Sequence, residues 1–223
     1  EEKAPVAGGR SLAQRQTALV AKQAASLDVL SGGRFRLGIG IGWNPVEFTG
    51  LNENFHNRGR RSVEQVQVMK ALWAEPHVTF EGEWHEIDDA GINPLPTKRA
   101  IPIWFGGHED VTLRRIAKWG DGWIMLAHSM GDKAKAEFAK LRAYVAEAGR
   151  DPNAVGLEVW VSPGDGGPDH WRQELQYWQG AGVTHITVNS TYGRGAHRRI
   201  PGRTIADHLA AMQQYRAAVA DLL

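Results

Sequence analysis

The chain of 223 residues is long enough to bury one sizeable hydrophobic core, and its length fits one domain better than two. Its formal net charge of +1 produces no large field that would attract nucleic acid or a membrane surface. The absence of cysteine excludes disulfides and thiolate chemistry and fits a cytoplasmic protein, and no apolar run reaches the ~20 residues of a spanning helix.

Residues 1–15 combine mixed charges, proline and glycine without a period, and we expect an irregular N-terminal segment there. From residue 16 onward, helical spacing of apolar residues alternates with short buried runs, which predicts strands and helices in turn. The expected main strands are residues 35–42, 101–105, 122–127, 157–162 and 183–189. The expected helices begin at Thr17, after Asn57, and at Glu109, Asp132, Asp169 and Thr204.

Two segments interrupt this alternation. A loop is expected over residues 45–57, and a hairpin insertion is expected near residues 78–88, with its turn at Glu81-Gly82. The alternation itself implies parallel strands joined by helical crossovers, in a single domain over residues 16–223. An open doubly wound sheet and a (β/α) barrel without its opening strands fit this pattern equally well.

The strand at 35–42 carries glycine at every second position, Gly38, Gly40 and Gly42, so the three should share one face. Glycine weakens a strand interior and usually marks the close approach of a ligand or of another backbone. The stripe therefore predicts either one wall of a flat cofactor's site or tight packing against a helix, and the spacing does not choose between them.

Trp43, Asn44 and Glu47 follow this strand at its carboxyl end, where α/β proteins place their sites. Asn44 is suited to hydrogen-bond a heterocycle, and Trp43 is suited to form an apolar wall. The dipeptide Asn44-Pro45 is also a common turn starter.

A second glycine pair, Gly106-Gly107, ends the strand at 101–105 and leads through His108 directly into a helix. Free backbone N–H groups and the positive end of the helix dipole favour a phosphate at such a turn. A plain strand-to-helix turn explains the glycines as well. Neither glycine stretch fits G-x-G-x-x-G with a later acidic residue, which argues against a nicotinamide-binding Rossmann domain.

Basic residues gather after the last strand, in a loop that holds Arg194, His197, Arg198, Arg199 and Arg203. Barrels often bind phosphate near their final strands, so Arg194 and Arg198 are candidates for binding an anion or a substrate. A solvated loop is the simpler alternative. Aromatic residues are not interleaved with these charges, which argues against a nucleic-acid surface.

Acid–base chemistry has few candidates near the predicted site. Glu47, His56 and His108 are the only titratable residues beside it, and His56 stands with three arginines at a helix entry that calls for an acidic neighbour or a ligand anion. The nine histidines show no H-E-x-x-H or comparable spacing, so no metal site is predicted. No G-x-S-x-G elbow is present as a starting point for Ser/His/Asp hydrolysis.

Several motifs, taken in order, resemble one family. The stretches 14–24, 27–34 and 37–43 are similar to the luciferase-like monooxygenases, and most similar to the branch that uses the deazaflavin coenzyme F420. The Asn93–Pro96 motif, the strand that ends in Gly106-Gly107, and Gly120-Asp121-Gly122-Trp123 agree with this resemblance. It covers essentially residues 12–223.

The resemblance implies a (β/α)8 TIM barrel of the bacterial-luciferase type that binds F420 or, alternatively, FMN at its carboxyl mouth. It implies hydride transfer or monooxygenation on a small organic substrate, in a homodimer. Gly40, Gly42, Trp43 and Asn44 are then expected along the cofactor ring. Gly106, Gly107 and His108 are expected at the cofactor phosphate.

The chain departs from the family at its start, where members have about three more strand–helix units. We therefore expect an incomplete barrel of about five of the eight units, with exposed strand edges, in a fragment or a natural short form. A non-catalytic binding or scaffold protein that keeps the fold is the alternative to the enzyme. A sugar hydrolase would need two carboxylates at neighbouring strand ends, and this sequence does not provide the second one.

Overall fold

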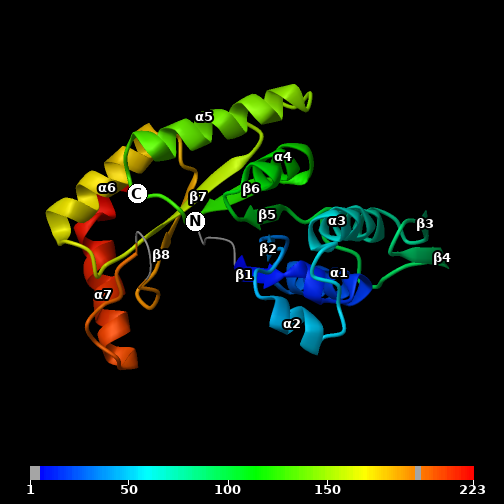
Figure 1. Cartoon of the computed structure of the whole chain (residues 1–223). Helices are drawn as coiled ribbons and strands as arrows, with labels where there is room; N and C mark the ends of the chain where they lie inside the picture. The colour runs from blue at the N-terminus through cyan, green and yellow to red at the C-terminus, as the bar shows by residue number, and fades with distance from the viewer. Residues whose placement is uncertain (1–5, 194–196) are drawn as a thin grey trace. The chain divides into compact units, whose positions relative to one another are not determined.

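The computed structural model describes residues 6–193 and 197–223 (Figure 1). The chain divides into two compact units, each of which has its own parallel strands and helices. The first unit comprises Glu1–Gly106 and Trp119–Asp121, and the second comprises Gly107–Lys118 and Gly122–Leu223. The expectation of a single domain over residues 16–223 stays a prediction.

The first unit contains the elements of the N-terminal half. They are β1 Val6–Ser11, the 3-10 helix η1 Leu12–Gln14, α1 Thr17–Leu30, β2 Arg36–Gly40, α2 Pro45–Gly50, α3 Arg58–Ala74, β3 Val78–Glu81, β4 Glu86–Ala90 and β5 Ile103–Gly106. Strands β1, β2 and β5 pair in parallel, in that order. The predicted helix at Thr17, the glycine-rich strand and the hairpin insertion are all confirmed, with β3 and β4 antiparallel.

The ladder of the first unit aligns the carboxyl ends of its strands. Ser11 of β1 is paired with Gly40 of β2, and Ile39 of β2 is paired with Phe105 of β5. One step further along the same register brings Gly40 level with Gly106. The ends of the three strands therefore lie at one edge of the sheet.

Two predictions for the first unit are wrong. Residues 6–14 are not irregular, because Val6–Ser11 forms β1 and Leu12–Gln14 forms η1. The local sequence has no apolar alternation that would predict a strand. These residues form one because they pair with β2. The predicted loop 45–57 contains α2, which starts at Pro45 because proline suits the first turn and the Asn44 side chain accepts a hydrogen bond from Val46 N at 3.2 Å.

The second unit repeats strand and helix as predicted. Its elements are α4 Asp110–Trp119, β6 Gly122–Met125, α5 Asp132–Glu147, β7 Gly156–Val161, α6 Pro168–Gly180, β8 His185–Val188, α7 Ile205–Ala218 and the 3-10 helix η2 Ala220–Leu222. Strands β6, β7 and β8 pair in parallel, with β7 in the middle. The predicted capping box of α7 is confirmed, since Thr204 and Asp207 bond each other's backbone N–H groups.

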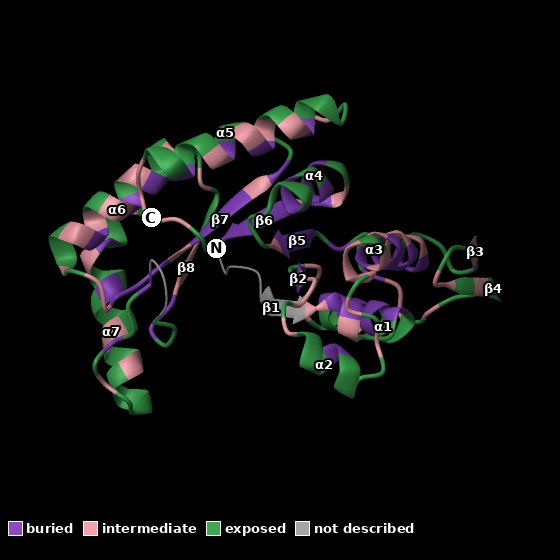
Figure 2. Cartoon of the chain, viewed as in Figure 1, coloured by how far each residue is buried: buried purple, intermediate pink, exposed green. Residues whose placement is uncertain are grey.

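Aromatic packing joins the helices of the second unit to its strands. Trp123 of β6 meets Phe138 of α5 edge-on, with ring centres 5.8 Å apart, and Phe138 lies 6.2 Å from Trp178 of α6. All three side chains are buried, and β6 and β7 form the buried centre of this unit in Figure 2. Phe138 and Trp178 point inward as their helical spacing predicts.

The glycine stripe is shorter than predicted, because β2 ends at Gly40 and Gly42 lies beyond it with φ +78°. A Cβ on Gly42 would lie 2.8 Å from the Phe48 ring, so α2 packs directly against this backbone. A Cβ on Gly40 would meet nothing within 4 Å. Glycine at 42 is therefore required by internal packing, whereas glycine at 40 leaves open space.

We expect Gly42→Ala to lower the free energy of unfolding by about 1–3 kcal/mol, because it adds a clash to an unfavourable positive φ. Gly40→Ala is the matched control, and its stability should be unchanged or raised by up to about 1 kcal/mol, since glycine is the poorer strand residue. Urea unfolding followed by tryptophan fluorescence measures both. Equal destabilisation of the two variants would contradict the packing argument.

Candidate functional site

The aligned strand ends of the first unit form an open edge. Gly40 and Gly106 are both partly exposed, and a Cβ on Gly106 would have Ile39 O at 3.8 Å as its nearest neighbour. Among the described residues, no side chain lies within 4 Å of a Cβ added at either glycine. This edge leaves backbone that a ligand can approach, and the predictions of Gly40 beside a cofactor ring and of Gly106 at its phosphate stay predictions.

Side chains at the corner after β2 are joined by hydrogen bonds. Glu47 Oε2 accepts a hydrogen bond from Gln14 Nε2 at 2.9 Å, and Glu47 Oε1 accepts one from Asn44 Nδ2 at 3.3 Å. Asn44 thus has internal partners at both ends of its amide, so its predicted contact with a cofactor stays a prediction. Trp43 is 79% exposed and remains available as an apolar wall.

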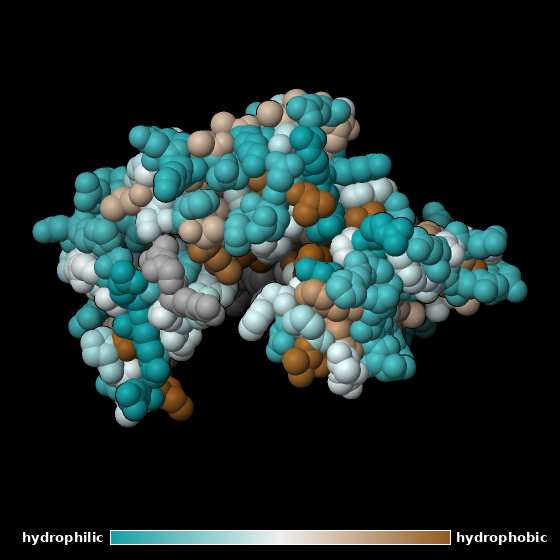
Figure 3. Space-filling model, in the orientation of Figure 1, coloured by the Kyte–Doolittle hydropathy of each residue, from teal (hydrophilic) through white to brown (hydrophobic). Residues whose placement is uncertain are grey.

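Apolar side chains continue over α2, where brown atoms gather in Figure 3. Val46 and Leu51 are 75% and 54% exposed. Together with Trp43 they make the corner after β2 apolar on its outside and polar within. A small organic molecule would contact both apolar and polar side chains there.

The basic helix entry before α3 is satisfied inside the protein. Arg58 Nε donates to Gly42 O at 3.1 Å and its guanidinium lies 3.7 Å from the centre of the Phe55 ring. Arg61 forms an ion pair with Glu53, which is the acidic neighbour that its position predicts. His56 is exposed, and its ring contacts Phe55 edge-on.

The turn before α4 belongs to the second unit from Gly107 onward. Gly107 has φ +110°, and its carbonyl accepts a hydrogen bond from Trp123 Nε1 at 2.7 Å, so a buried side chain fixes the turn. His108 is exposed, with Nε2 3.5 Å from Glu109 Oε1. The exposed turn is consistent with the predicted phosphate role of Gly106, Gly107 and His108, which stays a prediction.

Asp110, in the first turn of α4, is neutralised by its neighbours. It accepts hydrogen bonds from the Tyr144 hydroxyl at 2.5 Å and from Arg114 Nε at 3.1 Å, and Lys140 Nζ also lies 3.1 Å away. The Tyr144 and Lys140 donors lower the pKa of Asp110 to about 2. The carboxylate is therefore ionised at neutral pH, and its charge is directed away from the turn toward these partners.

In the basic loop after β8 residues 194–196 are not described, so Arg194 lies outside the described residues. Arg198 is exposed, its backbone N donates to Ser162 Oγ at 3.2 Å, and its guanidinium donates to His197 O at 3.3 Å. His197 is buried against the rings of Trp160 and Tyr192. The predicted anion-binding role of Arg194 and Arg198 remains a prediction.

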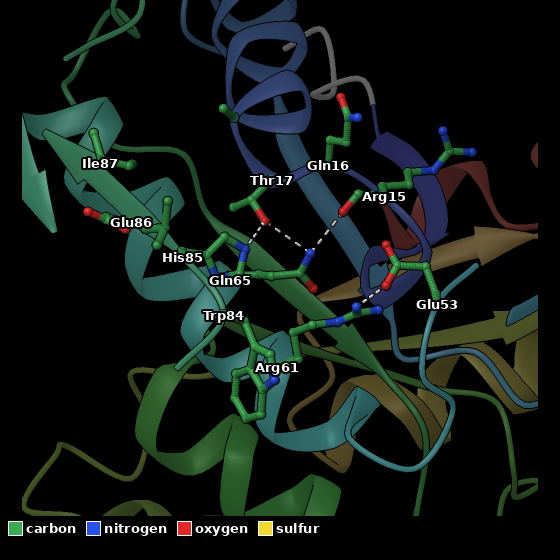
Figure 4. A pocket seen from close by; sticks show the side chains of 12 residues that line it. Arg15, Gln16, Thr17, Glu53, Arg61, Gln65, Trp84, His85, Glu86 and Ile87 are labelled. Atoms are coloured by element: carbon green, nitrogen blue, oxygen red, sulfur yellow. Dashed lines mark hydrogen bonds and ion pairs between the residues drawn. The ribbon is translucent and has the colours of Figure 1, made fainter. Parts of the chain in front are cut away.

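Sequence reasoning missed a cavity in the first unit, at the start of α1 (Figure 4). It has a volume of about 420 Å³ and is lined by residues of three segments, Arg15–Ala18, the stretch from Glu53 to Val68, and Trp84–Ile87 of the hairpin. Thr17 Oγ1 lies 2.6 Å from His85 Nε2, and His85 Nδ1 lies 2.8 Å from Glu64 Oε1. The three residues share no sequence motif, so only the fold reveals them together.

Glu64 organises the hairpin beside this cavity. Its carboxylate also accepts hydrogen bonds from the backbone N–H groups of Glu83 at 2.9 Å and Trp84 at 2.8 Å. Burial by itself raises the pKa of Glu64, but the hydrogen bonds from His85 and the two amides outweigh it, so the pKa is lowered. A Cβ on Gly82 would lie 2.6 Å from this carboxyl group, which explains the glycine in the turn.

Among the described residues, no group of histidine, aspartate and glutamate is placed to hold a metal ion. Within that same part of the chain, no helix is long and apolar enough to cross a membrane.

Three protein relatives have partly matching sequences. Pyrimidine monooxygenase RutA of Allorhizobium ampelinum is 33% identical over 153 residues, covering 65% of this chain and 41% of RutA. The FMNH(2)-dependent dimethylsulfone monooxygenase of Pseudomonas putida is 30% identical over 147 residues, covering 65% and 40%. An uncharacterized protein of Mycobacterium tuberculosis is 37% identical over 138 residues, covering 61% and 46%. The chain thus spans less than half the length of these three relatives.

Solved structures are similar over most of the chain. Monooxygenase RslO1 from Streptomyces bottropensis superposes with a TM-score of 0.78 at 18% identity, covering 98% of this chain and 78% of RslO1. An F420-dependent secondary alcohol dehydrogenase gives 0.71 at 18% identity, covering 92% and 75%. These likenesses show the fold, which is the luciferase-type (β/α) barrel in incomplete form. Since the sequence model described as luciferase-like monooxygenase matches residues 6–221, the chain belongs to the luciferase-like monooxygenase family.

Proposed function

We propose that this protein is a flavin- or deazaflavin-dependent oxidoreductase that acts on a small organic substrate by hydride transfer or monooxygenation. The observation that carries the proposal is the open glycine edge, where Gly40 and Gly106 end neighbouring parallel strands without a side chain above them. Strand ends of this kind are where α/β proteins bind their ligands. Relatives named for FMNH(2) and for F420 use the two cofactors that we propose.

The residues present fit such a cofactor. Its planar ring needs a surface without Cβ atoms, which Gly40 offers, and Gly106 at the end of the neighbouring strand leaves room for its phosphate end. When bound, the cofactor would supply the hydride or activate oxygen, while the chain binds it, orients the substrate and limits access of water.

The resemblance favours F420 over FMN, but the two relatives named for a cofactor divide between them. Both rings are flat and aromatic, so the glycine edge accepts either. The substrate is proposed only as a small organic molecule. Trp43, Val46 and Leu51 offer it an apolar surface beside the polar Asn44–Glu47 pair.

We expect the protein to bind F420 or FMN, and we expect Gly40→Val to weaken that binding at least about tenfold by placing a side chain in the ring's position. Titration of each cofactor, followed by its fluorescence, measures the affinity. Gly50→Val is the matched control, since Gly50 is an exposed glycine of α2 that also has nothing within 4 Å of an added Cβ.

Wild-type affinity in Gly40→Val would place the ring elsewhere. A folded wild-type protein that binds neither cofactor would favour the alternative of a non-catalytic scaffold. Circular dichroism on each sample separates loss of binding from loss of fold.

We also propose a homodimer formed through the outer face of α1. Val20, Ala21 and Ala24 of this helix are buried inward, yet Leu19, Leu27 and Leu30 are 52%, 47% and 83% exposed on the other side. Exposed apolar side chains grouped on one helix often mark an interaction surface. A second copy of the chain offers the same apolar face and so provides a self-complementary cover.

We expect Leu27→Glu combined with Leu30→Glu to convert a dimer to a monomer, because two carboxylates would be buried in the apolar contact. Light scattering after size-exclusion chromatography gives the mass of the particle. Ile205→Glu on α7 is the control, since Ile205 is 81% exposed and lies in the other unit. A wild-type protein with the mass of one chain would contradict the proposal.

A further inference from the structure

The cavity at the start of α1 contains none of the residues predicted for the cofactor. Thr17, Gln65 and His85 meet on its wall, as the dashed lines in Figure 4 show. Thr17 lines the cavity and is otherwise buried, with 4% of its surface exposed. The site is thus separate from the glycine edge and has its own polar chemistry.

The protons of this network can be assigned from its donors and acceptors. Gln65 Nε2 can only donate, and it donates to Thr17 Oγ1 at 3.0 Å. The Glu64 carboxylate accepts from His85 Nδ1–H, which leaves His85 Nε2 as the ring nitrogen that faces Thr17. The Thr17 hydroxyl then donates its proton to His85 Nε2 at 2.6 Å.

Each member of the network is held from elsewhere. Gln65 Nε2 is also 3.0 Å from Arg15 O and 3.3 Å from Leu12 O, which fixes the orientation of its amide. Glu64 is fixed by the two hairpin amides described above. A hydroxyl, an imidazole and a carboxylate in hydrogen-bonded series are the arrangement that activates a nucleophile in hydrolases.

The surroundings of Thr17 suit an anionic intermediate. Thr17 is the first residue of α1, whose N-cap Gln16 makes no side-chain hydrogen bond and whose first turn holds no acidic residue. The first N–H groups of a helix lack acceptors within it and carry the positive end of its dipole. Arg15 also lines the cavity, as do Arg61 and the Glu53 carboxylate with which Arg61 is paired. A negative oxygen that develops beside Thr17 would be stabilised here.

We propose that Thr17, His85 and Glu64 form a second active site in which Thr17 is the nucleophile, His85 the general base and Glu64 the orienting carboxylate, and that it hydrolyses small carboxylic esters. The cavity volume of about 420 Å³ restricts the substrate to a short acyl group with a small alcohol or phenol. Trp84 provides an aromatic wall for the leaving group.

The reaction needs only the ester and water. Thr17 Oγ1 adds to the carbonyl carbon while His85 Nε2 takes the hydroxyl proton. The bond from carbon to the alcohol oxygen then breaks, and His85 returns the proton to the departing alcohol. Water attacks the threonine ester by the same route, releases the carboxylic acid and restores the Thr17 hydroxyl.

The test uses the full chain without added cofactor and p-nitrophenyl acetate as the ester. We expect release of p-nitrophenolate that Thr17→Ala and His85→Gln each reduce at least about a hundredfold, and that Thr17→Ser retains. Gly50→Val is the control variant, since Gly50 does not line the cavity and an added Cβ there meets nothing within 4 Å, so it should leave this hydrolysis unchanged.

A second measurement does not depend on the variants. Wild-type protein is treated with diisopropyl fluorophosphate, digested and analysed by mass spectrometry, and the modified residue should be Thr17. Hydrolysis that survives Thr17→Ala, or a label found only on other residues, would overturn the proposal. So would wild-type protein that neither cleaves the ester nor takes the label, in which case the network only fastens the hairpin to α1. None of these outcomes depends on whether F420 or FMN binds.

Discussion

The parallel register of β1, β2 and β5 is the constraint on which the first unit depends. Because Ser11 is paired with Gly40 and Ile39 with Phe105, three strands end at one edge, and the segments after them begin there. Helix α1 starts six residues after β1, and α2 starts five residues after β2. The open glycine edge and the cavity at α1 therefore both follow from one hydrogen-bond ladder.

Outside the sheet, the hairpin depends on its hydrogen bonds to the Glu64 carboxylate. It accepts three hydrogen bonds from the hairpin, and the Gly82 turn is shaped around it. A buried carboxylate without these donors would be costly, so α3 and the hairpin specify each other. The same contact orients the His85 ring, which means that a bond needed for the fold also determines which ring nitrogen faces Thr17.

The alternation of strands and helices was predictable because periodicity reports burial directly, and the inward positions of Phe138 and Trp178 agree with it. β1 was not predictable, since its order comes from pairing with β2 rather than from its own residues. The prediction that Gly42 belongs to the strand is wrong for a related reason. The spacing of the glycines fits a strand, but Gly42 has a positive φ and its backbone packs against Phe48, so it lies beyond β2. Thr17, Glu64 and His85 left no signal because they are far apart in sequence and meet only through tertiary packing.

The two proposed sites make different demands on the same unit. The glycine edge depends on the absence of side chains, so it needs only that β2 and β5 keep their register. The cavity depends on three side chains from α1, α3 and the hairpin whose hydrogen bonds all have internal partners. An empty edge tolerates change in the surrounding loops, whereas removal of one member of a hydrogen-bonded network also weakens the bonds of the others. The cofactor edge is thus the more robust feature of the fold, and the cavity is the one whose chemistry is tied to particular residues.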